Sequence, residues 1–310
     1  MEATTLAGRS MIFAGGIGVA TPEAKTSAEA MQAGGLDWKV KLVDAGYVMN
    51  DGTYAKSRTG KKAVVRVDKD DNPVHDFGFV GRRYSCIQNT EMFDWCDRLV
   101  DDYGAKYEAA WSLYGGSEVG LTMKFPETVK IGGEDPYEKY LLLRARHDGT
   151  GSVVAAITDV RLYCTNMLNV AVKGAVRLVR VPHLTNATQK LAAARETFEL
   201  TFKYDEVFNA AMEKLIEKKL TDDRFAEITK TLLMETKFGG IEEKVTDILA
   251  LRETSSTLQD QYRQTAYGAF QAIAEWADWS RETKSAQGRV IDLLDGRVLR
   301  LKNNALAALS

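Results

Sequence analysis

Proline and glycine are distributed unevenly along this chain of 310 residues. All five prolines and 20 of the 25 glycines lie within the first 182 residues, whereas the last 128 residues hold no proline and five glycines. Proline is disfavoured inside helices, and both residue types favour turns. The sequence therefore predicts a turn-rich, strand-containing first part and a helical second part, with a boundary near Pro182.

Short apolar runs bounded by turn residues predict a series of strands in the first part. Apolar and charged residues alternate from Leu36 to Leu42, as in a half-buried strand, and Asn50-Asp51-Gly52 is typical of a hairpin turn. We expect strands at residues 36–42, 47–49, 53–54, 64–67, 77–80, 109–114, 119–125, 139–146, 153–163 and 176–181.

Helix signals are present in both parts of the chain. Thr26 and Glu29 form a capping box for a short helix that ends at Gly34, and the apolar spacing after Thr90 predicts an amphipathic helix to Tyr103. In the second part we expect helices over residues 188–202, 205–218, 222–235, 254–282 and 296–309.

These elements predict an α+β fold with a mostly antiparallel sheet and packed helices in the first part and an all-helical second part. We divide the chain into an N-terminal loop and short helix (1–34), an α+β core domain (35–186) and a helical region (187–310).

Charge and cysteine content narrow the functional classes. The chain has 41 basic and 43 acidic residues, and this near-neutral balance argues against indiscriminate binding to duplex nucleic acid. No apolar run reaches the roughly 18 residues of a membrane span, so we expect no integral membrane protein. Three cysteines without CxxC spacing, Cys86, Cys96 and Cys164, fit a reducing cytoplasm, and Cys96 is expected in the core.

Motifs for familiar chemistry are absent from the sequence. There is no phosphate-binding loop and no Gly-x-Ser-x-Gly, and His75, His147 and His183 stand apart from any second metal ligand at a standard spacing. We therefore expect no metal and no cofactor, and we favour a protein without enzymatic activity.

Basic residues cluster in the first part although the net charge is small. Arg144 and Arg146 are expected on one face of their strand, and aromatic residues are interleaved with the basic ones, as in grooves that bind single-stranded nucleic acid. A solvated surface over an aromatic core has the same composition. The candidate phosphate contacts are Lys56, Arg58, Lys61, Lys62, Arg66, Arg82, Arg83, Arg144, Arg146, Arg161 and Lys173. The candidates for base stacking are Tyr84, Trp111 and Tyr163.

Several short motifs occur in a fixed order. They are Gly35-Leu36-Asp37-Trp38-x-Val40, Val80-Gly81-x-x-Tyr84-x-x-x-Gln88-Asn89, His147-Asp148-Gly149, Arg161-x-x-Cys164-Thr165-Asn166, Pro182-His183-x-Thr185-Asn186, Gln264-Thr265-Ala266-Tyr267 and Ala274-Glu275-Trp276-x-Asp278-Trp279. With these motifs in this order, the chain resembles a phage/plasmid-like protein family that carries a domain of unknown function. Family members usually carry a Trp-His-containing glycine segment near the N-terminus, where this chain has Phe13–Gly18.

The resemblance implies a context rather than a mechanism. It implies a phage or plasmid protein that acts in the cytoplasm of a bacterial host. It also singles out motif residues whose role is unknown, namely Trp38, Asn89, His147, Asp148, Gly149, Cys164, Asn166 and His183.

The order of a helix, an antiparallel meander and a second helix is, more remotely, similar to ring-forming single-strand annealing proteins. Our leading hypothesis is a phage-encoded protein that binds and anneals single-stranded DNA in recombination or replication. It would act without enzymatic activity or cofactor, as a homo-oligomer in a ring or filament.

Two alternatives remain open. The first is an interaction module that binds a host or phage protein through the C-terminal helices. Its partner face, equally explained as a core stripe, would consist of Leu258, Tyr262, Ala266, Ala269, Ile273 and Trp276. The second is an enzyme whose site would comprise His147, Asp148, Arg161, Cys164, Asn166 and His183.

Overall fold

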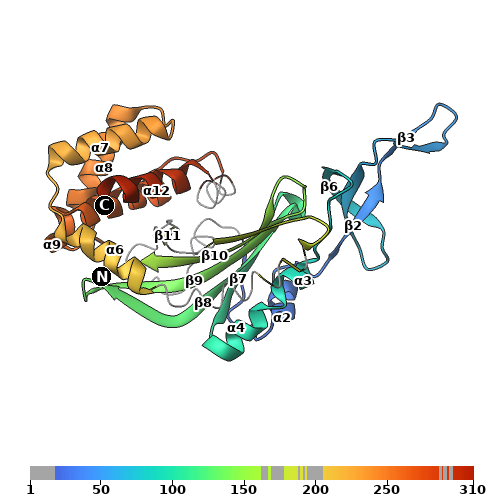
Figure 1. Cartoon of the computed structure of the whole chain (residues 1–310), viewed down its shortest axis with the longest axis horizontal. Coiled ribbons are helices and arrows are strands. Elements are labelled where there is room, and N and C mark those ends of the chain that lie inside the picture. The colour runs from blue at the N-terminus through green and yellow to red at the C-terminus, as the bar shows by residue number, and fades with distance from the viewer. Residues whose placement is uncertain are drawn as a thin grey trace.

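A long antiparallel sheet forms the middle of the molecule in the computed structural model (Figure 1). Its strand order is β1-β7-β8-β9-β10-β11, and β12 also pairs with β10. The strands are β1 (Val19–Ala20), β7 (Lys106–Leu113), β8 (Glu118–Ile131), β9 (Asp135–Arg146), β10 (Ser152–Arg161), β11 (Met167–Leu168) and β12 (Leu178–Pro182). The predicted α+β class and the antiparallel meander are confirmed.

The structure describes residues 18–161, 167–168, 178–187, 189–190, 193, 205–285, 288, 292 and 296–310. The N-terminal loop lies almost entirely outside these residues, as does most of the helix predicted over 188–202. Within residues 18–34, β1 pairs with β7 and the short helix α2 (Ser27–Ala33) packs into the core beneath the sheet. The predicted Thr26 cap and the predicted end at Gly34 are confirmed, since the Thr26 hydroxyl accepts from the Glu29 N–H at 3.2 Å. The capping box is only half formed, because the Glu29 carboxylate accepts from the Lys25 N–H at 2.8 Å instead of from Thr26.

Side chains on both faces of the sheet are buried. One face contributes Leu121 and Leu143 to a core shared with α2, α3 (Asn89–Phe93) and α4 (Cys96–Tyr103). The opposite face contributes Trp111, Tyr140 and Leu142 to a core shared with the C-terminal helices. Strands covered on both faces are apolar at successive positions, which explains why their sequences do not alternate cleanly.

The amphipathic helix predicted from Thr90 to Tyr103 is instead two helices, α3 and α4. A tighter turn separates them, because the Asp97 N–H donates to the carbonyl of Asp94, three residues back. Met92, Phe93, Trp95 and Cys96, on both sides of this turn, are all buried. The predicted end at Gly104 and the burial of Cys96 are confirmed.

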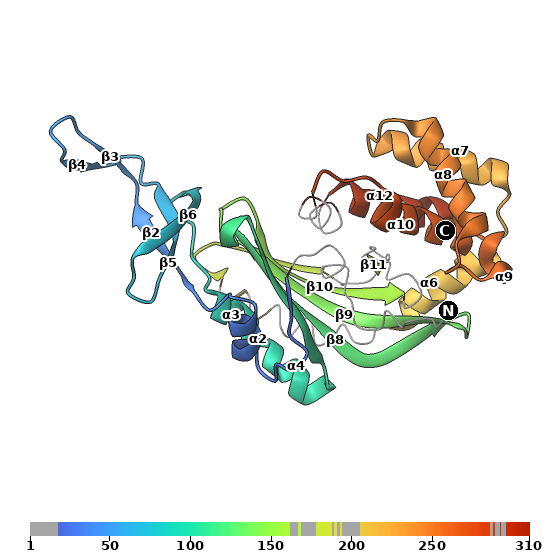
Figure 2. The same cartoon turned by 180° about the vertical axis from the view of Figure 1, so that it is seen from behind.

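An arm projects from one end of the sheet (Figures 1 and 2). It consists of a three-stranded sheet, β2 (Lys39–Asp44), β5 (Lys62–Val67) and β6 (Pro73–Val80), and a terminal hairpin, β3 (Gly46–Val48) and β4 (Tyr54–Lys56). A small core of Val40, Val64 and Val80 holds the three strands together. The predicted turn at Asn50-Asp51-Gly52 is confirmed, since Asp51 Oδ1 accepts from the Thr53 N–H at 2.9 Å.

The C-terminal helices gather at the other end of the molecule (Figure 1). They are α6 (Asp205–Glu217), α7 (Asp222–Glu235), α8 (Ile241–Thr254), α9 (Asp260–Arg263), α10 (Ala266–Glu275), a π-helical turn (Trp276–Ser280) and α12 (Arg297–Leu309). The predictions for α6, α7 and α12 are confirmed, and none of the described helices is long and apolar enough to cross a membrane.

The prediction of one helix over 254–282 is wrong, and α8 was missed. The helix is interrupted at Thr265. The Thr265 hydroxyl accepts from the Gly268 N–H at 3.1 Å, so this residue caps the start of a new helix, α10. Helix α8 has a weak sequence signal, because only Ile248 and Arg252 are buried on it and the second of these is charged.

The apolar stripe considered as a partner face is part of the helical core. All six of its residues are buried, with Ala266, Ala269 and Ile273 fully enclosed by the surrounding helices. A buried polar network also joins α10 to β9. The Tyr267 hydroxyl donates to Asp135 Oδ2 at 2.5 Å and lies 2.6 Å from the Tyr137 hydroxyl, which accepts from Gln271 Nε2 at 2.8 Å.

Glu118 anchors two arginines within the sheet. Its carboxylate accepts from Arg144 Nη1 at 2.8 Å and from Arg146 Nε at 2.7 Å, and the Glu118 side chain is 2% exposed. The prediction that both arginines share one face is confirmed. Because Arg144 is also buried, removal of the carboxylate takes away a charged partner from a guanidinium that is shielded from water.

We therefore expect Glu118→Ala to lower the free energy of unfolding by about 3–5 kcal/mol in urea titrations. Glu227→Ala is the matched control, because Glu227 forms an exposed pair with Arg224 and should change stability by less than about 1 kcal/mol. Equal effects of the two substitutions would contradict the anchoring role.

Candidate functional site

Aromatic and histidine side chains that are distant in sequence meet where the arm joins the sheet. His147 forms a three-ring cluster with Trp38 and Phe77, with centroid distances of 5.5 Å and 5.8 Å from His147 and 5.8 Å between the other two rings. His183 stacks on Tyr84 at 5.1 Å and lies 6.2 Å from His147. We call these five residues the arm joint.

Two side chains of the Gln88-Asn89 motif fasten helix α3 to the base of the arm. The Gln88 amide bonds both backbone groups of Val40, with Oε1 accepting at 3.0 Å and Nε2 donating at 2.9 Å. Asn89 Nδ2 donates to the carbonyl of Leu36 at 2.9 Å. These contacts hold the first strand of the arm in place, so the motif positions the arm relative to the sheet.

The Asn89 contact also determines the proton position on His147. Because Asn89 Nδ2 is the donor to Leu36, Oδ1 is left as the acceptor for His147 Nε2 at 2.9 Å. Nε2 therefore carries the proton, and Nδ1 is a bare acceptor that is buried and has no partner among the residues that the structure describes. Within the same residues, both ring nitrogens of His183 are likewise buried without partners.

Burial keeps the histidines at the joint neutral. It lowers the pKa of His147 to about 3, and His183 adds to this effect; burial also lowers the pKa of His183. A group with a pKa of about 3 is a weak general base near neutral pH. Burial also raises the pKa of the nearby Cys86 thiol to about 11, which disfavours a thiolate nucleophile. These shifts favour a structural role for the joint over catalysis.

Asp148 and Gly149 form the tip of the β9–β10 hairpin. Asp148 Oδ1 accepts from the backbone N–H of Thr150 at 2.8 Å and from its hydroxyl at 2.6 Å. Gly149 has a φ of 79°, and a Cβ there would come within 2.6 Å of Val80 Cγ1. The tip therefore packs against the arm only because this residue lacks a side chain.

Seven of the predicted phosphate contacts lie on the arm or at its base. Lys61, Arg82 and Arg83 are exposed, and Arg82 Nη2 donates to the Arg58 carbonyl at 3.4 Å, which brings two loops together. Arg66 lies over Trp38. The seven residues are Lys56, Arg58, Lys61, Lys62, Arg66, Arg82 and Arg83.

The other basic candidates are elsewhere. Arg144 and Arg146 hold Glu118, and the burial of Arg144 is a physical reason against phosphate contact. Arg161 ends β10 opposite Tyr137, nine residues or about 30 Å from the arm end of that strand. Lys173 lies outside the described residues, as do Cys164, Asn166 and Tyr163.

The structure changes the choice of stacking residues. Trp111 is 1% exposed and its indole covers Gly120 on the next strand, so it is not accessible to a base. Tyr84 is half-buried against His183. The arm aromatics Tyr47, Tyr54 and Phe79 are not among the predicted stacking residues, yet they are 56%, 58% and 65% exposed. Tyr47 and Tyr54 could have been recognised from the sequence, because both lie beside the predicted Asn50-Asp51-Gly52 turn.

Within the part of the chain that the structure describes, no group of three or more His, Cys, Asp or Glu side chains is arranged to hold a metal ion. Of the residues considered for an enzyme site, His147, Asp148 and His183 are brought together, whereas Arg161 is at the far end of its strand.

The neutral histidines make stability depend on pH. Below pH 6.5 an unfolded histidine binds a proton, while folded His147 stays neutral until about pH 3, so the unfolded state gains protons first. We expect the free energy of unfolding to fall as the pH is lowered from 6.5 toward 4, by up to about 1.4 kcal/mol per pH unit for each such histidine. His147→Gln should flatten this slope in urea titrations, whereas Phe77→Leu should lower stability without flattening it. An unchanged slope in His147→Gln would contradict the assignment.

Comparison with known proteins identifies a family but no described relative. Residues 76–299 match the family model described as Domain of unknown function (DUF932). No curated protein and no solved structure matches this chain. The matched segment includes β7–β10, most of the arm joint and the C-terminal helices from α6 to α10, and it spans well over half of the chain. The chain therefore belongs to the DUF932 family of proteins with a domain of unknown function.

Proposed function

We propose that this protein binds single-stranded nucleic acid, in the first instance single-stranded DNA, along its arm. The observation that carries the proposal is the combination of exposed aromatic rings and exposed basic side chains on one projecting element. Such a surface offers stacking for unpaired bases and neutralisation for phosphates. Annealing of complementary strands by a homo-oligomer, and an origin in a phage, are parts of the same proposal.

The aromatic side chains are presented by a narrow hairpin. Tyr54 is held in place because its hydroxyl donates to the Asp44 carbonyl at 2.7 Å, which leaves the ring exposed. Tyr47 lies opposite Ala55 on the same hairpin, and Phe79 lies opposite Ala63 on the arm sheet. The small neighbours leave the faces of these rings accessible, and each ring offers a flat surface to a base.

The charge distribution supports the same surface. Residues 37–83 carry ten basic and seven acidic side chains, whereas the rest of the chain carries 31 basic and 36 acidic ones. Lys41 and Lys56 form exposed pairs with Asp71 and Asp44. No ion pair within the described residues involves Lys61, Arg82 or Arg83, so their charges are open to phosphates. A polyanion would be steered to the arm rather than to the C-terminal helices.

The hairpin also supports self-association. Among the described residues β3 and β4 pair only with each other, and Val48 and Met49 at the tip are exposed. An isolated two-stranded hairpin is only marginally stable in water. A contact between copies that buries this tip would stabilise it, and a repeated head-to-tail contact generates a ring or a filament.

Binding to a single-stranded oligonucleotide of about 30 nucleotides is expected to weaken steeply as salt is raised. The combined variant Lys61→Ala, Arg82→Ala and Arg83→Ala should reduce the slope of log affinity against log salt by about 2, at about 0.7 per lost phosphate contact. Tyr54→Ala should cost about 1–3 kcal/mol of binding free energy without changing the slope.

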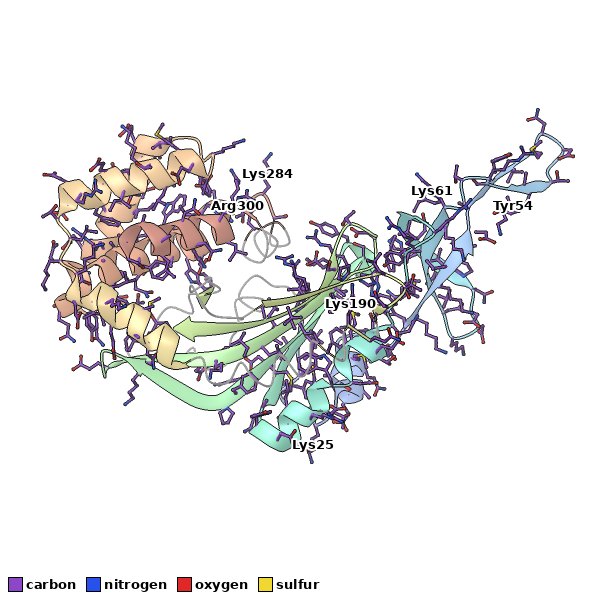
Figure 3. All side chains as sticks on the ribbon, viewed as in Figure 1. Lys25, Tyr54, Lys61, Lys190, Lys284 and Arg300 are labelled. Atoms are coloured by element: carbon purple, nitrogen blue, oxygen red, sulfur yellow. The ribbon has the colours of Figure 1, made fainter. Side chains whose placement is uncertain are left out.

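The matched control is the combined variant Lys25→Ala, Lys284→Ala and Arg300→Ala. These three residues are exposed and lie away from the arm, as Figure 3 shows. Fluorescence anisotropy at several salt concentrations measures all of these affinities. Absence of binding at low salt, or equal losses in the arm and control variants, would contradict the proposal.

A further inference from the structure

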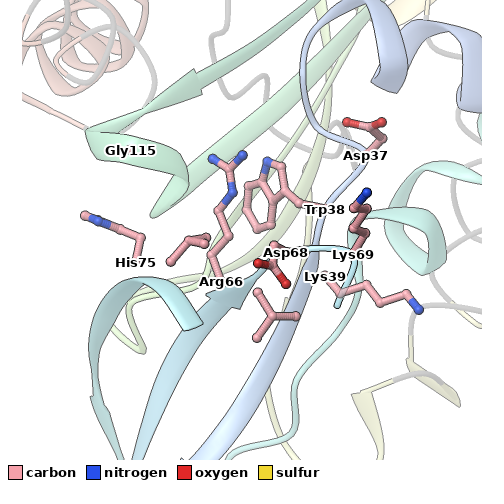
Figure 4. A pocket seen from close by; sticks show the side chains of 10 residues that line it. Asp37, Trp38, Lys39, Arg66, Asp68, Lys69, His75 and Gly115 are labelled. Atoms are coloured by element: carbon pink, nitrogen blue, oxygen red, sulfur yellow. The ribbon is translucent and has the colours of Figure 1, made fainter. Parts of the chain in front are cut away.

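A pocket of about 750 Å³ opens between the arm and the Gly115 turn of the main sheet (Figure 4). Its size is within the range of pockets that bind small organic ligands. Its charged and aromatic lining consists of Asp37, Trp38, Lys39, Arg66, Asp68, Lys69 and His75.

Arg66 and Trp38 form a flat platform in this pocket. Arg66 Cζ lies 4.8 Å from the centre of the indole, and Figure 4 shows the guanidinium beside the ring. The indole is fixed from behind, because its Nε1–H donates to the Gly35 carbonyl at 3.0 Å and the ring packs against Phe77 and His147. The platform is therefore positioned before any ligand arrives, which lowers the entropic cost of binding.

The neighbouring polar groups suit a base and a phosphate together. Arg66 lies on the same face of the arm sheet as His75, its direct cross-strand neighbour, and both line the pocket. Arg66 Nε is buried and has no hydrogen-bond partner among the described residues. Lys39 and Lys69 supply exposed ammonium groups, and Asp37 supplies an exposed carboxylate, which accepts from an amino or ring N–H group on the edge of a base. A purely anionic ligand would have no use for the aromatic platform or for Asp37.

We infer that this pocket binds one nucleobase of the strand, unstacked from its neighbours, with an adjoining phosphate on Lys39 or Lys69. The base stacks on the Arg66–Trp38 platform, and His75 borders the opposite side. This inference rests on the proposed function, and it adds a base-binding site at the root of the arm that is distinct from the rings at its tip.

The first test uses tryptophan fluorescence with three probes: an oligonucleotide of fifteen thymidines, dAMP and inorganic phosphate. The oligonucleotide and dAMP should quench the emission, whereas phosphate alone should not. Trp38→Phe, which keeps an aromatic ring at the joint, should lose most of the quenching. Trp279→Phe is the matched control, because this tryptophan lies in the helical region, and it should retain the quenching.

Arg66→Lys keeps the charge and removes the planar group. It should weaken binding of the oligonucleotide by roughly five- to hundredfold with little change in salt slope. A second measurement uses wild-type protein and so does not depend on folding of the variants. An oligonucleotide with a single 5-iodouracil base is photo-cross-linked, and the modified peptide should contain Trp38 or His75.

The possible outcomes distinguish binding of a base in the pocket from binding of the strand along the arm. If the oligonucleotide binds but Arg66→Lys and Trp38→Phe behave as wild type, or cross-links occur only at Tyr47 and Tyr54, the pocket inference is overturned and strand binding stands. If dAMP binds in the pocket but no oligonucleotide binds, the proposed function is overturned and the pocket stands. If inorganic phosphate and dAMP compete equally well with the oligonucleotide, the inference that the pocket recognises a base is overturned.

Discussion

Burial of both faces of the β8–β9 strand pair is the constraint on which the rest of the structure depends. Leu121 and Leu143 face the N-terminal helices, while Tyr140 and Leu142 face the C-terminal helices. Because each face must be covered, the helices before the meander pack on one face of the sheet and the helices after it pack on the other. The pair also carries the turns at Gly115 and Gly149, which form the surface against which the arm packs.

The arm joint fixes the position of the arm at the end of this sheet. Gln88 and Asn89 bond to the segment that enters β2, and neutral His147 and His183 pack against aromatic rings. The motif residues at this joint thus have a shared physical role in positioning the arm. The residues proposed to meet the strand are different ones, on the arm surface and in the pocket beside Trp38.

Local sequence signals predicted most of the elements but failed where packing decides. The Asn50-Asp51-Gly52 turn and the Thr26 cap depend on nearby residues, and both are confirmed. The break between α3 and α4, the division of 254–282 and the existence of α8 depend on which side chains the core can accept. For the site, the basic cluster on the arm was recognised. Arg144 was misjudged, because nothing near it in sequence shows that Glu118 faces it across the sheet.

The sequence by itself determined the α+β class, the strands in the first part and helices in the second, and the strand-turn-strand order, because proline, glycine and side-chain periodicity act on the local backbone. Only the tertiary structure decided that His75, His147 and His183, which come from three separate segments of the sequence, meet at one end of the sheet. It also decided that Trp111 is buried while Tyr54 is exposed, and that Arg66 lies over Trp38 beside a pocket. These features depend on strand pairing and burial between distant segments, and no short stretch of sequence encodes such contacts.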